Sequence, residues 1–189
     1  MRRLIAFNHM SLDGYFTSAS GDFRWAHAGN DDPEYQSFVK ENASGGGELL
    51  FGRVTYELMA SYWPTPMAKQ HDAAVAEAMN RMSKVVFSRK LDQVSWSNTR
   101  LVRDDLASAV RQMKQAEGPG MAILGSGSII AQLAAENLID EYQVVVDPVV
   151  LGGGRTMFNG LPAPLSLSLL RTRVFRNGKV FLAYEPVHA

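Results

Sequence analysis

Short apolar runs alternate with segments of helical periodicity along most of the chain. The apolar runs have the length of buried strands and lie at residues 4–7, 48–51, 85–87, 99–102, 121–124 and 141–146. Between them, apolar residues recur every three or four positions, which predicts helices beginning near residues 33, 52, 67, 106 and 128. This alternation predicts an α/β fold with a mostly parallel central sheet flanked by helices.

The C-terminal part follows a different pattern. Two extended runs, at 165–175 and 179–184, are joined by Asn177-Gly178. This dipeptide suits the tight turn of a hairpin, because both residues tolerate a positive φ. We therefore expect the sheet to end in an antiparallel C-terminal hairpin.

Two segments in the first half have patterns of their own. Residues 11–32 read as a long polar loop, and the helical pattern of 67–82 reads as one continuous helix. The first helix is expected to begin at Asp31-Asp32-Pro33-Glu34, where an acidic cap precedes proline, and to end at the glycines of 45–47.

Composition narrows the class of protein. The 189 residues suit one domain, 1–189, and the absence of cysteine excludes disulfides, thiolate metal sites and cysteine nucleophiles. The four histidines lack metal-ligand spacing, so no metal is expected. Nineteen basic and nineteen acidic residues cancel, which gives no sign of nucleic acid or membrane partners. Without a signal segment or a long apolar run, we expect a cytoplasmic protein.

Three strand-to-helix or strand-to-turn junctions share an anion-binding character. They are the runs Gly52-Arg53-Val54-Thr55, Ser88-Arg89 and Gly125-Ser126-Gly127-Ser128-Ile129. Glycines and free helix amides suit phosphate, and arginine adds a charged fork. Because ligands of open α/β sheets bind beyond the carboxyl ends of the strands, the three junctions together predict a site for the phosphates of a dinucleotide.

Taken singly, each junction has a plainer interpretation as a turn. A Gly-Arg pair often only starts a helix, and Ser-Arg-Lys after a strand is often a solvated loop. The glycine-rich run is also neither a complete dinucleotide fingerprint, which needs a downstream acidic residue, nor a Walker loop.

The order of several motifs resembles the dihydrofolate-reductase-like superfamily. These motifs are Leu4-Ile5-Ala6-Phe7, Ser11-Leu12-Asp13-Gly14, Gly52-Arg53-Val54-Thr55-Tyr56-Glu57, Gly125-Ser126-Gly127-Ser128 and the run 148–154 that ends in three glycines. The resemblance is greatest to the reductase domain of the bifunctional riboflavin-biosynthesis deaminase/reductase and to its stand-alone relatives. The cysteine-containing motif of the deaminase domain has no counterpart in this sequence.

The resemblance implies an NADPH-dependent reductase of the same fold. Residues 52–55 then match the segment that binds the adenosine-side phosphates of NADPH. Ser88 and Arg89 match the turn near its 2′-phosphate, and residues 125–129 match the loop under its pyrophosphate. Asn8 and His9 fall where the backbone meets the nicotinamide carboxamide. A homodimer is also implied, and the apolar 165–170 region with the final hairpin offers an exposed edge for it.

The substrate implied is a small heterocycle, pteridine-like or 5-amino-6-(5-phosphoribosylamino)uracil-like. Asp13 and Glu34 are candidate catalytic carboxylates, and Trp25 is a candidate wall for a flat ring. Gly153, Gly154 and Arg155 are expected on the substrate side of the site, because they follow the strand that ends near Asp147-Pro148.

Each candidate again has a structural alternative. Asp13 could be a turn residue, Trp25 could pack at the edge of the core, and the glycines could only reverse the direction of the chain. Two other functions stay open on the sequence. One is a non-catalytic nucleotide-binding module, and the other is a phosphate-ester hydrolase, for which no carboxylate cluster or activated nucleophile is found.

Overall fold

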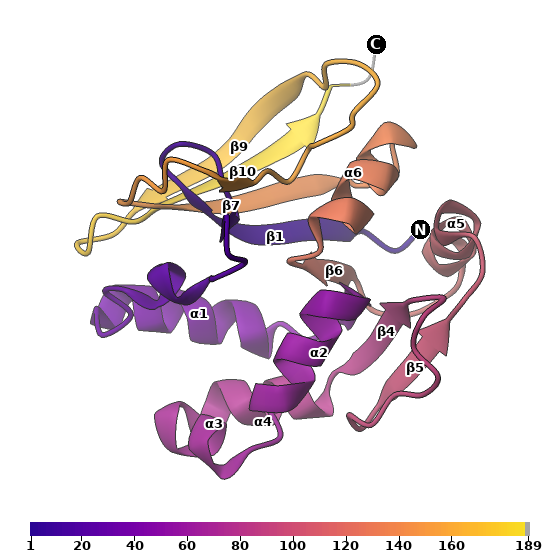
Figure 1. The fold of residues 1–189 in the computed structure, drawn as a ribbon, viewed down its shortest axis with the longest axis horizontal. Helices are drawn as coiled ribbons and strands as arrows, with labels where there is room; N and C mark the ends of the chain where they lie inside the picture. The colour runs from indigo at the N-terminus through magenta and orange to yellow at the C-terminus, as the bar shows by residue number, and fades with distance from the viewer. Residues whose placement is uncertain (188–189) are drawn as a thin grey trace.

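The computed structural model describes residues 1–187 and shows one large sheet with helices packed against it (Figure 1). The strands of the large sheet are β1 (Leu4–Ser11), β3 (Glu48–Gly52), β4 (Ser83–Phe87), β5 (Thr99–Val102), β6 (Met121–Leu124), β7 (Glu141–Asp147), β9 (Leu167–Val174) and β10 (Val180–Pro186). The helices are α1 (Pro33–Ser44), α2 (Arg53–Tyr62), α3 (Pro66–His71), α4 (Ala73–Arg81), α5 (Leu106–Gln115) and α6 (Gly127–Ala135).

The strand order in this sheet is β5-β4-β3-β6-β1-β7-β10-β9. The pairs among β5, β4, β3, β6, β1 and β7 are all parallel, whereas β10 runs antiparallel to both β7 and β9. The fold class expected from the sequence is therefore confirmed: the sheet is mostly parallel and ends in an antiparallel C-terminal hairpin. Because the parallel strands end at the same edge, their loops meet there.

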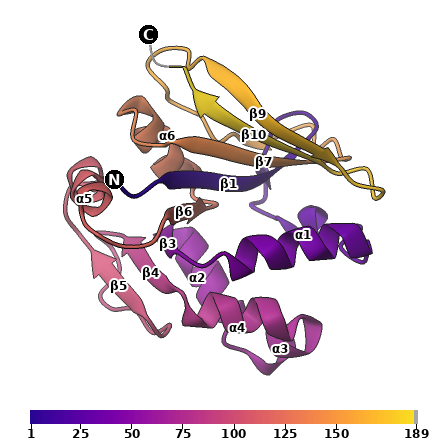
Figure 2. The same cartoon turned by 180° about the vertical axis from the view of Figure 1, so that it is seen from behind.

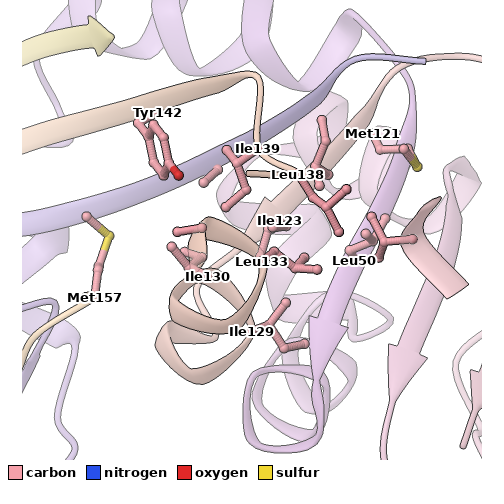
Figure 3. Close-up of a cluster of buried hydrophobic side chains, with 14 of the residues drawn as sticks. Leu50, Met121, Ile123, Ile129, Ile130, Leu133, Leu138, Ile139, Tyr142 and Met157 are labelled. Carbon is pink, nitrogen blue, oxygen red and sulfur yellow. The ribbon is translucent and has the colours of Figure 1, made fainter. Parts of the chain in front are cut away.

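Each face of the sheet has its own apolar core. On one face, the buried side chains of α5 and α6 pack on β1, β3 and β6; Ile129, Ile130 and Leu133 lie next to Leu50 and Ile123 (Figure 3). On the other face, α1, α2 and α4 group together (Figure 2) and cover the opposite side chains of the same strands. The alternating side chains of each strand thus serve two cores.

The prediction of one continuous helix over 67–82 is wrong, because Asp72 separates two helices, α3 and α4. Asp72 is extended, with φ −154° and ψ 98°, and its carboxylate accepts hydrogen bonds from the amides of Ala74 and Val75. An aspartate side chain that caps new amides competes with continuation of the preceding helix. The first helix starts as expected, with Asp32 accepting from the amide of Tyr35 at 2.8 Å.

The polar segment 11–32 contains more structure than the loop predicted for it. β1 continues to Ser11, and the segment holds a short strand, β2 (Thr17–Ser18), and a 3₁₀ helix, η1 (Arg24–His27). β2 pairs antiparallel with β8 (Gly154–Arg155), so the loop lies against the glycine-rich run after β7. This pairing between distant segments leaves no periodic signal in either one.

Candidate functional site

A large open cleft of about 2550 Å³ runs along the sheet and includes the edge where β3, β4 and β6 end. Single-ligand pockets typically have about 300–1,000 Å³, so this cleft has room for a dinucleotide and a second ligand. All the residues predicted to bind a cofactor line it: Asn8, His9, Gly52, Arg53, Val54, Thr55, Ser88, Arg89, Gly125, Ser126, Gly127, Ser128 and Ile129.

Ser126 joins the loops that precede α2 and α6. Its hydroxyl accepts a hydrogen bond from the amide of Gly52 at 2.8 Å and donates one to the hydroxyl of Thr55 at 2.8 Å. Ser126 itself is left-handed, with φ 61° and ψ 60°, and it is buried. The two junctions therefore form one connected unit.

The helices that start from this unit differ from the other four. Among the described residues, no side chain caps the N-terminus of α2 or of α6. By contrast, α1, α3, α4 and α5 are capped by Asp32, Thr65, Asp72 and Asp105. Uncapped helix N-termini carry a partial positive charge and unpaired amides that suit an anion. Both open on the cleft.

The third junction adds cations beside these helices. The hydroxyl of Ser88 accepts hydrogen bonds from the amides of Lys90 and Leu91, which fixes the turn after β4. Arg89 and Lys90 are exposed on this turn. Arg53, at the start of α2, pairs with Glu57 at 2.8 Å in an exposed contact between successive helical turns. Such a pair contributes only about 0.3–0.5 kcal/mol to stability. Arg53 can therefore leave Glu57 and pair with a more highly charged anion.

The cleft also contains two buried polar atoms without a partner. Within residues 1–187, these are Nδ2 of Asn8 and Oγ1 of Thr17, and both residues line the cleft. Buried polar side chains are nearly always hydrogen-bonded in folded proteins, because an unmade hydrogen bond costs about 1–3 kcal/mol. The two atoms are therefore suited to hydrogen-bond a polar ligand group.

A buried network that the sequence did not reveal lies behind the same cleft. His9 contacts the Asp147 carboxylate through Nδ1 at 2.8 Å and the Tyr35 hydroxyl through Nε2 at 3.1 Å. Lys179 forms an ion pair with the other oxygen of Asp147 and donates to the carbonyl of Ala26 at 2.9 Å. The only sequence signal was the polar pair Asn8-His9 within a strand.

Asp13 lies outside the residues that line the cleft. Its carboxylate accepts hydrogen bonds from the hydroxyl of Ser11 and from the amides of Leu151 and Gly152. The Ser11 hydroxyl and these two amides hold the pKa of Asp13 below its usual value, so the carboxylate is ionised near neutral pH. The geometry ties the loop after β1 to the loop after β7.

Glu34 and Trp25 also lie away from the cleft lining, contrary to the expectation for each. Glu34 extends from the first turn of α1 to Arg173 of β9, at 3.1 Å. The indole nitrogen of Trp25 donates to the carbonyl of Asp22, and its ring stacks edge-on against Phe23. Phe23, rather than Trp25, lines the cleft near His9, with ring centroids 5.8 Å apart.

Only some residues of the glycine-rich run after β7 line the cleft. Gly154 and Arg155 line the cleft, whereas Gly153 does not. A Cβ on Gly154 would overlap the carbonyl oxygen of Thr17, so glycine is required there by the close approach of β2 to β8. Gly152 adopts a positive φ of 70°, which glycine also permits. Backbone packing thus explains two of the three glycines.

Two features are absent from residues 1–187. No helix in this part of the chain is long and apolar enough to cross a membrane. No group of three or more histidine or acidic side chains there is arranged to hold a metal ion.

Known proteins resemble the chain in sequence and in fold. It is 25% identical over 184 residues to the protein YyaP of Bacillus subtilis, across 97% of this chain and 95% of YyaP. A diaminohydroxyphosphoribosylaminopyrimidine deaminase/5-amino-6-(5-phosphoribosylamino)uracil reductase from Thermotoga maritima superposes with a TM-score of 0.69 at 14% identity; the match covers 98% of this chain and 57% of that one.

Dihydrofolate reductase from Enterococcus faecalis, solved with NADP(H), superposes with a TM-score of 0.63 at 16% identity over 98% of this chain and 97% of that one. These two structural likenesses establish the fold. The model of the RibD C-terminal domain matches residues 2–181, and the chain therefore belongs to the RibD C-terminal domain family.

Proposed function

We propose that this protein is an NADPH-dependent reductase of a small heterocyclic substrate. The observation that carries the proposal is the pair of uncapped helices, α2 and α6, joined through Ser126 and open on one cleft. Two helix N-termini held at a fixed separation suit the phosphates of a dinucleotide. The solved complex of a dihydrofolate reductase with NADP(H) supports the same choice of cofactor.

The residues of the cleft fit the parts of NADPH. The amides at the starts of α2 and α6 would bind the phosphates, and Arg53 and Arg89 would pair with the 2′-phosphate. The unpartnered amide group of Asn8 and hydroxyl of Thr17 would bind the nicotinamide carboxamide, which offers both an acceptor and donors. The bound cofactor supplies a hydride, and the chain contributes by placing the substrate beside it.

The substrate would occupy the other half of the cleft, between η1 and α1. Phe23, His27 and Tyr35 line this half with flat rings. Gly154 and Arg155 also line the cleft, and Arg155 would bind a phosphate or carboxylate of the substrate. We propose a pteridine- or 5-amino-6-(5-phosphoribosylamino)uracil-like compound, because the Enterococcus faecalis and Thermotoga maritima reductases that share this fold are named for substrates of these two kinds.

The experiment is a titration of the protein with NADPH and NADH, followed by an assay of nicotinamide absorbance with 5-amino-6-(5-phosphoribosylamino)uracil. We expect tighter binding of NADPH than of NADH and a substrate-dependent loss of absorbance. Absence of binding by either cofactor would refute the proposal. Tight binding without oxidation by any heterocycle of this class would instead indicate a non-catalytic nucleotide-binding module.

A further inference from the structure

The buried network of Tyr35, His9, Asp147 and Lys179 lies behind the substrate half of the cleft, and the contacts proposed for NADPH do not use its side chains. Its members come from α1, β1, β7 and the β9–β10 hairpin, and η1 adds the carbonyl of Ala26. His9 is its member with the most open side chain, 15% exposed, against 2% for Asp147 and 1% for Lys179. The network therefore reaches the cleft through an imidazole.

The contacts of His9 define its tautomer. A carboxylate only accepts hydrogen bonds, so the proton of neutral His9 lies on Nδ1, directed at Asp147. Nε2 is then an acceptor for the Tyr35 hydroxyl. Burial, followed by the charge of Asp147, raises the pKa of Tyr35, so this hydroxyl keeps its proton and donates. Nε2 is the atom of His9 that can gain and release a proton.

Stabilisation of the fold does not by itself explain the buried Asp147–Lys179 ion pair. Burial of two charges costs desolvation free energy that their attraction often fails to offset. Lys179 neutralises Asp147 and fixes one of its oxygens, which leaves the other oxygen to orient the imidazole. Lys179 itself lies 5.1 Å from the centre of the Tyr35 ring, so the same cation helps to position both partners of His9.

From this geometry we infer that His9 is the proton donor of the reduction, with Asp147, Lys179 and Tyr35 as its positioning residues. This inference rests on the proposed function. Reduction of a C=N bond requires a hydride on carbon and a proton on nitrogen. The hydride comes from NADPH, which becomes NADP⁺; the proton leaves Nε2 of the His9 imidazolium, which becomes neutral and keeps its Nδ1 proton toward Asp147. Solvent then reprotonates Nε2 for the next turnover.

Other charged groups near His9 favour this assignment over the neighbouring histidine. From η1 and the segment before it, His27 and Asp22 face the site. Tyr35 comes from α1, Asp147 from β7 and Lys179 from the turn between β9 and β10. Desolvation and the charges of His9 and Lys179 lower the pKa of His27, which has no carboxylate contact in the described residues. Of these two histidines, His9 is therefore the one whose ring is oriented by a carboxylate among the described residues.

The first test needs no substrate and uses the ring-nitrogen NMR signals of the histidines in the intact protein. We expect neutral His9, whose signals are assigned with His9→Gln, to carry its proton on Nδ1, directed at Asp147. A neutral His9 that carries its proton on Nε2 would overturn the inference.

The second test follows NADPH oxidation with 5-amino-6-(5-phosphoribosylamino)uracil. His9→Gln should slow hydride transfer about 100-fold or more and leave NADPH affinity unchanged. The rate of this variant should no longer depend on a protonated group of the protein. Tyr35→Phe should cost less, because Tyr35 only positions the ring. A larger loss in Tyr35→Phe than in His9→Gln would assign the proton to tyrosine and overturn the inference.

A matched control exists on the surface. Nδ1 of His71 pairs with the Tyr62 hydroxyl at 3.0 Å, a histidine–tyrosine contact without an acidic partner in the described residues. His71→Gln should leave the rate and its pH profile unchanged. If wild-type protein binds no NADPH, the proposed function fails; if it reduces the probe and His9→Gln does so equally well, only the proton-donor assignment fails.

Discussion

The amide of Gly52 donates a hydrogen bond of 2.8 Å to the hydroxyl of Ser126, 74 residues further along the chain. This contact joins the ends of β3 and β6, which are neighbouring strands, and fixes the N-termini of α2 and α6 relative to each other. Ser126→Ala removes this bond and the one to Thr55. We expect a loss of stability of about 1–2 kcal/mol and roughly tenfold weaker NADPH binding, measured by urea unfolding and fluorescence titration.

Ser128→Ala is the control for the stability effect, since Ser128 is exposed on the next turn. It should unfold at the same urea concentration as wild type. Equal stability of Ser126→Ala and wild type would contradict the structural role of the Ser126 hydroxyl.

Arg53 should discriminate between the two nicotinamide cofactors. Charge-assisted hydrogen bonds to a phosphate are worth about 1.5–3 kcal/mol, so Arg53→Ala should weaken NADPH binding roughly ten- to hundredfold and NADH binding little. Calorimetry with both cofactors measures the difference. Glu57→Gln, which removes the exposed partner of Arg53, should leave NADPH binding equal or tighter. Equal losses for both cofactors in Arg53→Ala would give Arg53 a different role.

Gly154 and Gly153 form a matched pair for the loop after β7. Gly154→Ala places a methyl group against the Thr17 carbonyl and should cost about 1–3 kcal/mol, whereas Gly153→Ala meets no atom within 4 Å and has an ordinary φ. Thermal unfolding of both variants measures the difference. A Gly154→Ala protein as stable as Gly153→Ala would show that β2 and β8 do not pair closely in solution.

Lys84 should give the folding stability a distinct alkaline dependence. It is buried, donates to the carbonyls of Asn80 and Met82, and lies 4.5 Å from the Trp96 ring. Burial lowers its pKa to about 8 from 10.5. Between these values the unfolded chain binds more protons than the folded one, so the Lys84 contribution to the free energy of unfolding rises with pH.

Lys84→Met lacks this rise. Between about pH 7.5 and pH 10, wild type should gain on the order of 2 kcal/mol relative to Lys84→Met in urea unfolding. The exposed Lys69→Met serves as control and should follow wild type at both pH values. A constant difference between wild type and Lys84→Met would show that Lys84 titrates normally in the folded protein.

The β9 edge carries the prediction of a homodimer. β9 is the last strand of the sheet, and Leu169, Leu170 and Val174 are 52%, 40% and 69% exposed. Exposed apolar edges are usually covered by another chain. Light scattering should give about twice the chain mass, and Leu169→Lys should reduce it to the monomer. A wild-type mass near 20.8 kDa at micromolar concentration would contradict a dimer.

The sequence by itself determined the elements whose causes are local. Apolar periodicity gave the parallel strands and most helices, and Asn177-Gly178 gave the hairpin turn, since each depends on residues within a few positions. The three junctions that line the cleft could also be located from their local runs of glycine, serine and arginine, and anion binding by them stays a prediction. That the junctions would meet followed from the common edge of parallel strands.

Only the tertiary structure decided which polar groups meet across the sheet. His9 lies 138 residues from Asp147, and Asp147 lies 32 from Lys179, so their contact depends on the order β1-β7-β10. Glu34 was expected in the site, yet the same sheet order brings Arg173 to it at the surface. Contacts of this kind depend on the distance between strands in space, which carries no periodic signal in the sequence.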